Sequence, residues 1–203
     1  MVRLRSALCD ILRIEIPIIQ APMGVATPAL VAAVSNAGGL GMLGTGNLRS
    51  TDEIRAAILE TRGLTDRPFG ANLILRGQPD VAERLAACLD ERVSVISFFW
   101  EDPAGYIERV HEAGSLVTYT VASAEDARRA VRAGVDIVVT QGWEAGGHVR
   151  GQVASLPLIP RVVDAVRPTP VVAAGGIADG RGMAAAMALG AAGVWMGTRF
   201  LLS

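Results

Sequence analysis

The sequence has few of the residues that build metal or redox centres. Its 203 residues include two cysteines, Cys9 and Cys88, and two histidines, His111 and His148. The cysteines are far apart and form no CxxC pair or Cys/His set, which argues against a metal or redox role. We therefore expect no metal site, and two buried thiols in a reducing cytoplasm.

Long apolar runs and an excess of one charge are also missing. No apolar run approaches the ~20 residues that span a bilayer, and residues 1–5 lack the apolar region of a signal peptide. These absences predict a soluble, cytoplasmic protein. The formal net charge is −1 and the charges are scattered, which argues against nucleic acid or an anionic membrane as partner. A small uncharged or mildly anionic ligand fits better.

What the sequence does contain is a regular alternation of two patterns. With 51% hydrophobic and 19% charged residues, the chain can bury a large core, and we expect one domain over residues 1–203. Apolar, β-branched runs begin near residues 17, 39, 69, 93, 116, 135, 170 and 193. Segments with helical periodicity separate them, at 27–37, 50–62, 79–91, 103–113, 124–133, 158–166 and 180–189. Ser50 and Ser123, each followed by acidic residues, are expected helix N-caps.

Alternating strands and helices, with strands apolar on both faces, predict a parallel sheet covered by helices. Eight such runs favour an α/β fold of the TIM (β/α)₈ type, with a short helix over residues 3–12 closing the barrel floor. An open doubly wound sheet is the alternative, because residues 38–41 (GGLG) resemble a dinucleotide fingerprint. That fingerprint needs its glycines between a strand and a helix, whereas these follow a helix and precede a strand.

Two glycine-containing segments near the C-terminus predict a phosphate site. Residues 173–177 (AAGGI) end the seventh run and residues 196–199 (MGTR) break the eighth. In TIM barrels the loops after strands seven and eight commonly bind a phosphate, because glycine lets backbone N–H groups approach the anion. The alternative is that these glycines only make tight turns.

The loop at 140–151 (TQGWEAGGHVRG) is the expected centre of the chemistry. His148 follows two glycines after an apolar strand, and an imidazole suits proton transfer or donation to a developing anion. The alternative is a solvated loop histidine, which is the interpretation we adopt for His111 on its charged helix. Glu144 could pair with Arg150 or orient His148, and we assign it no catalytic role.

Polar and aromatic residues at other strand ends add to this site. Asn72 and Gln141 carry amides that need either a loop or a ligand as hydrogen-bonding partner. Residues 98–100 (FFW) with Trp143 could form an apolar roof over a substrate, although packing in the core is the alternative for at least two of them. Trp195 and Met196 are expected to fill the barrel.

Several motifs together resemble one family. They are QAPM (20–23), VSNAGGLG (34–41), PFGANL (68–73), QGWEAGGH (141–148), AAGGIADGRG (173–182) and MGTRF (196–200). From about residue 14 onward the sequence resembles the nitronate monooxygenases, formerly called 2-nitropropane dioxygenases. The resemblance implies an FMN-dependent TIM barrel that oxidises alkyl nitronates or nitroalkanes with O₂ to a carbonyl compound and nitrite.

The resemblance also implies roles for individual residues. His148 would be the active-site histidine, which binds the nitro group or takes the α-proton of a neutral nitroalkane. The implied contacts with the flavin ring and its polar edge, and with the phosphate, fall on Ala21, Pro22, Met23, Asn72, Thr120, Gln141, Gly146, Ala174, Gly175, Gly176, Gly197 and Thr198. Many relatives have Lys or Gln where this chain has Thr120, so one contact to the flavin is expected to be lost.

Two further expectations follow from the family pattern. Relatives continue beyond the end of this chain, so we expect it to lack the last helix and the segment that helps to cover the substrate. An eighth strand over residues 194–201 would then have an uncovered outer face, which predicts a homo-oligomer or a marginally stable fragment.

The motifs leave two other functions open. The flavin-dependent enoyl-acyl-carrier-protein reductases, which use NAD(P)H, share the motifs at 144–148 and 174–180, but usually have Gly-Gly-Met where this chain has Ala21-Pro22-Met23. A non-catalytic, truncated FMN-binding protein is the third possibility.

Overall fold

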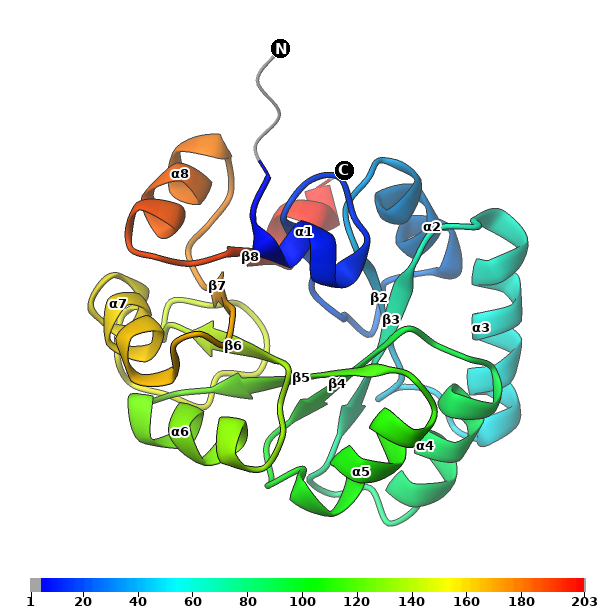
Figure 1. The fold of residues 1–203 in the computed structure, drawn as a ribbon. Coiled ribbons are helices and arrows are strands. Elements are labelled where there is room, and N and C mark those ends of the chain that lie inside the picture. The colour runs from blue at the N-terminus through cyan, green and yellow to red at the C-terminus, as the bar shows by residue number, and fades with distance from the viewer. Residues whose placement is uncertain (1–4, 203) are drawn as a thin grey trace.

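The structure is a computed structural model that describes residues 5–202. Its described part contains one eight-stranded sheet in the order β1-β8-β7-β6-β5-β4-β3-β2, with all neighbouring strands parallel. The helices surround the sheet (Figure 1). The strands are β1 (Ile18–Gln20), β2 (Gly41–Gly44), β3 (Phe69–Ile74), β4 (Val95–Phe99), β5 (Leu116–Val121), β6 (Ile137–Gln141), β7 (Val171–Ala174) and β8 (Gly193–Met196). This arrangement confirms the predicted TIM-barrel fold.

Helices lie between consecutive strands at the predicted places. They are α2 (Pro28–Asn36), α3 (Thr51–Leu64), α4 (Val81–Asp90), α5 (Ala104–Glu112), α6 (Ala124–Arg132), α7 (Ser155–Val166) and α8 (Gly180–Ala188), preceded by α1 (Ala7–Leu12). The hydroxyls of Ser50 and Ser123 accept hydrogen bonds from the backbone N–H groups of Glu53 and Asp126, at 3.2 and 3.0 Å. Both predicted N-caps are therefore confirmed. Throughout residues 5–202, no helix is both long and apolar enough to cross a membrane.

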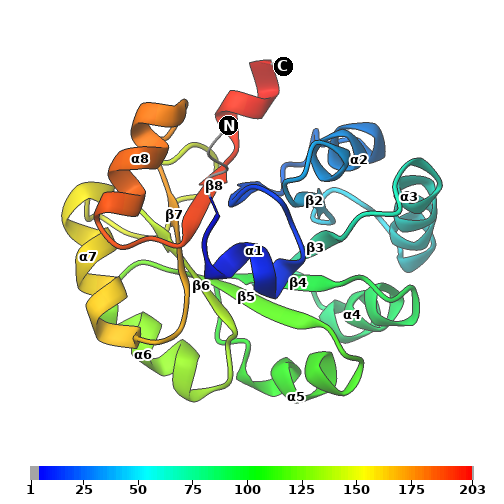
Figure 2. The same ribbon diagram turned by 45° about the horizontal axis from the view of Figure 1, so that its top comes forward.

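Helix α1 closes one end of the barrel (Figure 2). Leu8, Cys9 and Leu12 are buried against strand residues that point into the barrel, such as Ile19 and Val95. The helix is shorter than the predicted 3–12: Ser6 is extended at φ −140°, so the helix begins at Ala7. Residues 3 and 4 lie outside the described part of the chain.

The two cysteines are free and buried, as expected. Burial raises the pKa of the Cys88 thiol to about 12. This thiol therefore stays protonated and unreactive at neutral pH.

The last predicted strand was too long. Strand β8 ends at Met196, and Thr198–Leu202 form a 3₁₀ helix, η1. The turn begins at Gly197, whose carbonyl accepts a 2.8 Å hydrogen bond from the N–H of Phe200. The chain after β8 thus turns over the barrel instead of extending the strand.

The barrel is closed between β1 and β2 by a side chain as well as by backbone. Two isolated bridges join the segments of these strands, Ile19 with Leu40 and Met23 with Leu43. Between them, the amide of Gln20 accepts a hydrogen bond from Met42 N–H at 3.1 Å and donates one to Met42 C=O at 3.3 Å. Gln20 is fully buried. Its side chain therefore satisfies the backbone of β2 where the backbone of β1 does not.

Replacing Gln20 with leucine is expected to destabilise the barrel while its volume changes little. Both backbone groups of Met42 would lose their partner in a buried seam, at a cost of about 1–3 kcal/mol for each unsatisfied group. Urea denaturation measures the free energy of unfolding, and the exposed Gln152→Leu variant is the control. Equal midpoints for Gln20→Leu and the parent would show that the seam does not depend on this amide.

Candidate functional site

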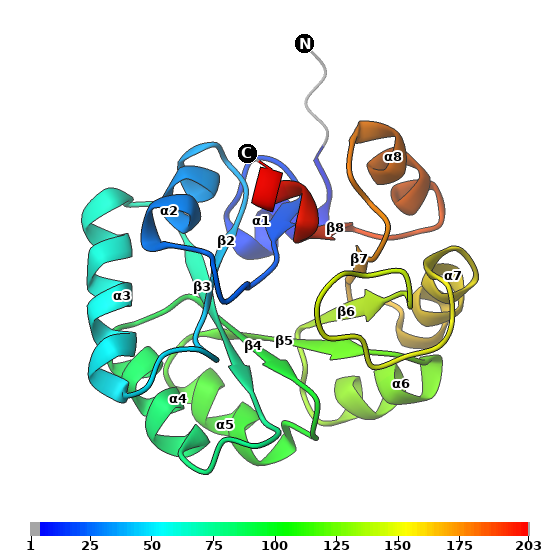
Figure 3. The same cartoon turned by 180° about the vertical axis from the view of Figure 1, so that it is seen from behind.

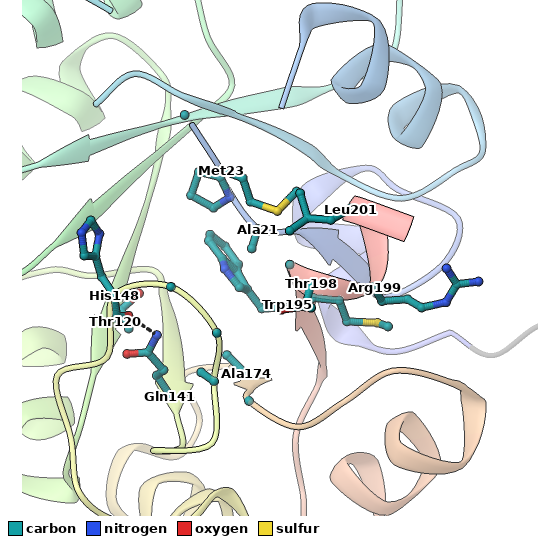
Figure 4. A pocket seen from close by; sticks show the side chains of 18 of the residues that line it. Ala21, Met23, Thr120, Gln141, His148, Ala174, Trp195, Thr198, Arg199 and Leu201 are labelled. Atoms are coloured by element: carbon teal, nitrogen blue, oxygen red, sulfur yellow. Dashed lines mark hydrogen bonds between the residues drawn. The ribbon is translucent and has the colours of Figure 1, made fainter. Parts of the chain in front are cut away.

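A cavity of about 800 Å³ lies at the carboxyl ends of the strands, among the loops that follow them. Figure 3 shows the barrel from the side opposite to that of Figure 1, with α1 behind the strands. Every site residue predicted from the sequence lines the cavity. These residues are Ala21, Pro22, Met23, Asn72, Thr120, Gln141, Gly146, His148, Ala174, Gly175, Gly176, Gly197 and Thr198. Figure 4 shows the side chains around this cavity. The fold therefore brings the strand ends of the whole barrel together, while the role of each residue stays a prediction.

The predicted phosphate loops form one side of the cavity. Gly175 and Gly176 have φ angles of +107° and +71°, a region that favours glycine. The N–H groups of Gly175, Gly176 and Gly197 make no hydrogen bond to any described residue. Unpaired N–H groups on glycine turns are the arrangement that binds an anion. These residues therefore fit the terminal phosphate of a nucleotide.

The gap between the β6 loop and η1 is narrow. A Cβ atom placed on Gly146 would lie 2.6 Å from the Thr198 hydroxyl oxygen. Opposite, Gly44 lets β2 approach the first strand, because a Cβ there would lie 2.6 Å from the carbonyl oxygen of Met23. Glycine at these two positions therefore lets the segments around the cavity approach each other closely.

Two buried polar side chains of the cavity wall have no partner in the described structure. Asn72 and Thr120 are each 7% exposed, and neither the Asn72 amide nor the Thr120 hydroxyl makes a hydrogen bond to a described residue. Their polar atoms are not fully buried and reach the cavity, where solvent or a ligand can pair them. A ligand with polar ring atoms would pair them, which fits the predicted contact of Asn72 with a flavin.

Gln141 has partners within the protein. Its amide nitrogen donates to the carbonyl of His148 at 2.9 Å (Figure 4). Its amide oxygen accepts from Arg150 N–H at 3.4 Å. This amide therefore holds the histidine loop. Bonding of Gln141 to a flavin stays a prediction.

The imidazole of His148 is exposed toward the cavity and rests against two aromatic rings. Its centroid lies 6.4 Å from the Phe99 ring and 6.1 Å from the Trp100 ring. Neither ring nitrogen bonds to a described residue. The ring is thus held by stacking, while its nitrogens are free to exchange a proton or a hydrogen bond with a ligand.

Some predicted contacts differ in the structure. Glu144 pairs with neither Arg150 nor His148, but accepts hydrogen bonds from the backbone N–H and hydroxyl of Ser155 at 3.0 and 2.6 Å. Burial alone would raise the pKa of Glu144, but these hydrogen bonds lower it. Glu144 therefore fastens the β6 loop to the start of α7.

The aromatic roof is only partly as expected. Phe99 lines the cavity, but Trp143 is 61% exposed and does not, while Phe98 stacks on Tyr106 at 5.8 Å in the core. Trp195 and Met196, expected as filler, are walls of the cavity. Strand β8 is short, so its last residues lie at the level of the site.

His111 is exposed on α5, as expected, but it also has a partner within the protein. Its Nε2 lies 2.9 Å from a carboxylate oxygen of Asp136, which also accepts a hydrogen bond from Val117 N–H. The side chain is 39% exposed. His111 therefore ties α5 to the floor of β6, away from the cavity.

Sequence reasoning missed part of the wall. Gly46 and Asn47 follow β2, and Leu201 and Leu202 come from η1. The first pair could have been found, because a Gly-Asn turn after a strand marks the same barrel face. The leucines gave no signal, because Leu201 was expected in the last strand and Leu202 directly after it.

Comparisons with known proteins identify the family. The nitronate monooxygenase family model matches residues 5–84 and 74–203. Among curated relatives, the nitronate monooxygenase of Pseudomonas aeruginosa is 41% identical over 95% of this chain and 68% of its own length. A Mycobacterium tuberculosis protein, 5-hydroxy-7a-methyl-1-oxo-octahydro-1H-indene-4-carboxyl-CoA dehydrogenase, is 46% identical over 99% of this chain, which spans 57% of that protein.

Solved structures give a similar picture. FabK from Thermotoga maritima has a TM-score of 0.94 and 48% identity, covering 98% of this chain and 63% of its own. A nitroalkane oxidase from Streptomyces ansochromogenes has a TM-score of 0.86 and 36% identity, covering 97% of this chain and 68% of its own. The family match over nearly the whole chain and the shared barrel lead to one conclusion: this chain belongs to the nitronate monooxygenase family.

Proposed function

We propose that the chain is the FMN-binding barrel of an oxidoreductase that oxidises alkyl nitronates with O₂ to a carbonyl compound and nitrite. The observation that carries this proposal is the combination, in one cavity, of unpaired glycine N–H groups after β7 and β8 with a free imidazole on the β6 loop. A site for one terminal phosphate favours FMN, and family membership supports a flavin enzyme.

Residues in different parts of the cavity would have different roles. Gly175, Gly176, Gly197 and Thr198 would hold the phosphate, and Asn72 would bond the polar edge of the ring. Residues 21–23 and Gly146 would lie along its faces. The bound flavin supplies the group that accepts electrons from the substrate.

His148 would act on the substrate. It would donate a hydrogen bond to the negatively charged nitro group of a nitronate, or remove the α-proton of a neutral nitroalkane. Phe99 and Trp100 cover part of its ring, so they would restrict water there and direct its nitrogens toward the cavity.

A second candidate is oxidation or reduction of an acyl thioester, including enoyl-acyl-carrier-protein reduction with NAD(P)H. It is favoured by the 46% and 48% identities to the CoA dehydrogenase and FabK, against 41% to the Pseudomonas nitronate monooxygenase. Ala21-Pro22-Met23 at the end of β1 favours nitronate oxidation. A non-catalytic FMN-binding protein is the third candidate.

Cofactor extraction followed by anaerobic mixing tests these candidates. We expect the extracted cofactor to be FMN, and its visible absorbance to bleach with a nitronate and to return, with release of nitrite, when O₂ is admitted. Bleaching by NADH alone, or by an acyl-CoA thioester, would favour the thioester reaction, and no bleaching by any of the three would favour the non-catalytic protein. Extraction of FAD, or a colourless protein after reconstitution with FMN, would contradict FMN binding.

A further inference from the structure

Tyr119 lies behind the wall of the cavity and is not one of the residues that line it. It is 5% exposed on β5 and belongs to the core between strands and helices, whereas the next residue, Thr120, lines the cavity. Its hydroxyl donates to the carbonyl of Trp100 at 2.9 Å and accepts from a guanidinium nitrogen of Arg150 at 2.8 Å. One hydroxyl thus joins two loops that the sequence separates.

The first of these loops carries His148. Arg150 is held at its guanidinium by Tyr119, with Asp126 at 3.6 Å, and its backbone N–H donates to Gln141. Gln141 also binds the carbonyl of His148 at 2.9 Å. The backbone that follows the imidazole-bearing residue, from the His148 carbonyl to Arg150, is therefore anchored to strands β5 and β6.

The second loop carries the ring against which His148 rests. Trp100 has a φ of +83°, a left-handed conformation that a bulky residue adopts only when its surroundings hold it there. The Tyr119 hydroxyl binds its carbonyl, and Arg76 lies 4.5 Å above its indole ring. The Trp100 ring in turn lies 6.1 Å from the imidazole.

We propose that Tyr119 is a positioning residue for His148, acting through Arg150 on one side and through the carbonyl of Trp100 on the other. Burial raises the pKa of Tyr119, against the opposing effect of Arg150, so the hydroxyl remains a donor at neutral pH. The inference rests on the proposed function only for the reaction that His148 serves. The place of the imidazole can be measured without any reaction.

The test compares Tyr119→Phe with Tyr106→Phe, its match, because these are the two tyrosines of the chain. Tyr106 stacks on Phe98, and its hydroxyl makes no hydrogen bond to a described residue. NMR of the imidazole groups resolves two histidines, and His111→Gln assigns them. We expect Tyr119→Phe to move the His148 signals, as the ring-current contribution of Trp100 changes, and to leave those of His111 in place.

Kinetics give the second measurement. Tyr119→Phe should lower kcat about ten- to a hundredfold, the range expected for a misplaced catalytic group, with FMN affinity unchanged. Tyr106→Phe should leave both unaltered. Unmoved His148 signals together with unchanged kcat in Tyr119→Phe would overturn the proposal.

A second variant covers the case in which Tyr119→Phe does not fold. Arg150→Met removes the guanidinium that donates a hydrogen bond to the Tyr119 hydroxyl. The Arg150 side chain is 28% exposed. Its control is Arg129→Met, which also pairs with Asp126 but does not touch Tyr119. We expect Arg150→Met to move the His148 signals and Arg129→Met to leave them. If Arg150→Met shifts the His148 signals but His148→Ala leaves turnover unchanged, the positioning role is supported and the proposed chemistry is contradicted. The positioning role and the proposed chemistry can therefore fail separately.

Discussion

Replacing Gly146 with leucine is expected to weaken FMN binding by roughly ten- to a hundredfold, the equivalent of the 1–3 kcal/mol that overpacking costs. Gly146 stands at the narrow gap between the β6 loop and η1, where even a methyl group would lie 2.6 Å from the Thr198 hydroxyl oxygen. Its φ is not in the left-handed region, so the new residue is not strained there. The leucine would occupy the space that we assign to the flavin ring.

The measurement is fluorescence titration of the apoprotein with FMN, with thermal melting of the same samples to show that the barrel is intact. Gly105→Ala is the matched control, because a Cβ at Gly105 on α5 meets nothing within 4 Å. It should bind FMN like the parent. FMN affinity of the parent retained in Gly146→Leu would place the ring elsewhere in the cavity.

The architecture could be predicted because the barrel repeats one local pattern. The strand runs are mainly apolar, Ser50 and Ser123 mark two helix starts, and the order of the runs determines the parallel neighbours. The two errors at the ends have local causes. Ser6 stands at the N-cap position, so α1 begins at Ala7, and the turn at Gly197, which the sequence marked as a break, ends β8 before it.

The walls of the cavity could be predicted for the same reason. Carboxyl ends of parallel strands meet at one face, so residues after each strand had to gather there. The resemblance to the family then selected Gly175, Gly176 and Gly197, and the structure shows their N–H groups unpaired.

Hydrogen-bond partners within the site could not be predicted. Gln141 and Asn72 carry the same expectation from the sequence, an amide that needs a partner. In the structure the amide of Gln141 bonds the His148 loop, whereas the amide of Asn72 bonds no described residue. Glu144 could reach several partners in sequence, and only the packing of α7 selects Ser155. Nothing local in the sequence around Tyr119 shows that its hydroxyl meets both Arg150 and Trp100.

Removal of the imidazole in His148→Ala is expected to lower turnover roughly 10²-fold or more, the usual size of a lost general acid or base, while FMN stays bound. Three features of the structure predict this separation. The ring nitrogens have no partner among the described residues, the unpaired glycine N–H groups lie on other strands, and the loop is anchored through the backbone carbonyl of His148, which alanine retains. The substitution should therefore remove the catalytic role of the imidazole and leave the cavity unchanged.

The choice of substrate makes this prediction sharper. A neutral nitroalkane must lose its α-proton before oxidation, whereas a preformed nitronate has already lost it, so the loss in His148→Ala should be greater on the nitroalkane. Steady-state rates of nitrite release on both substrates, with bound FMN measured by absorbance, give the comparison. The control is His111→Ala, which removes the other histidine of the chain and its contact with Asp136 far from the cavity. It should alter stability but not the ratio of the two rates. Equal activity of His148→Ala and the parent on both substrates would reduce His148 to a structural residue that rests on Phe99 and Trp100.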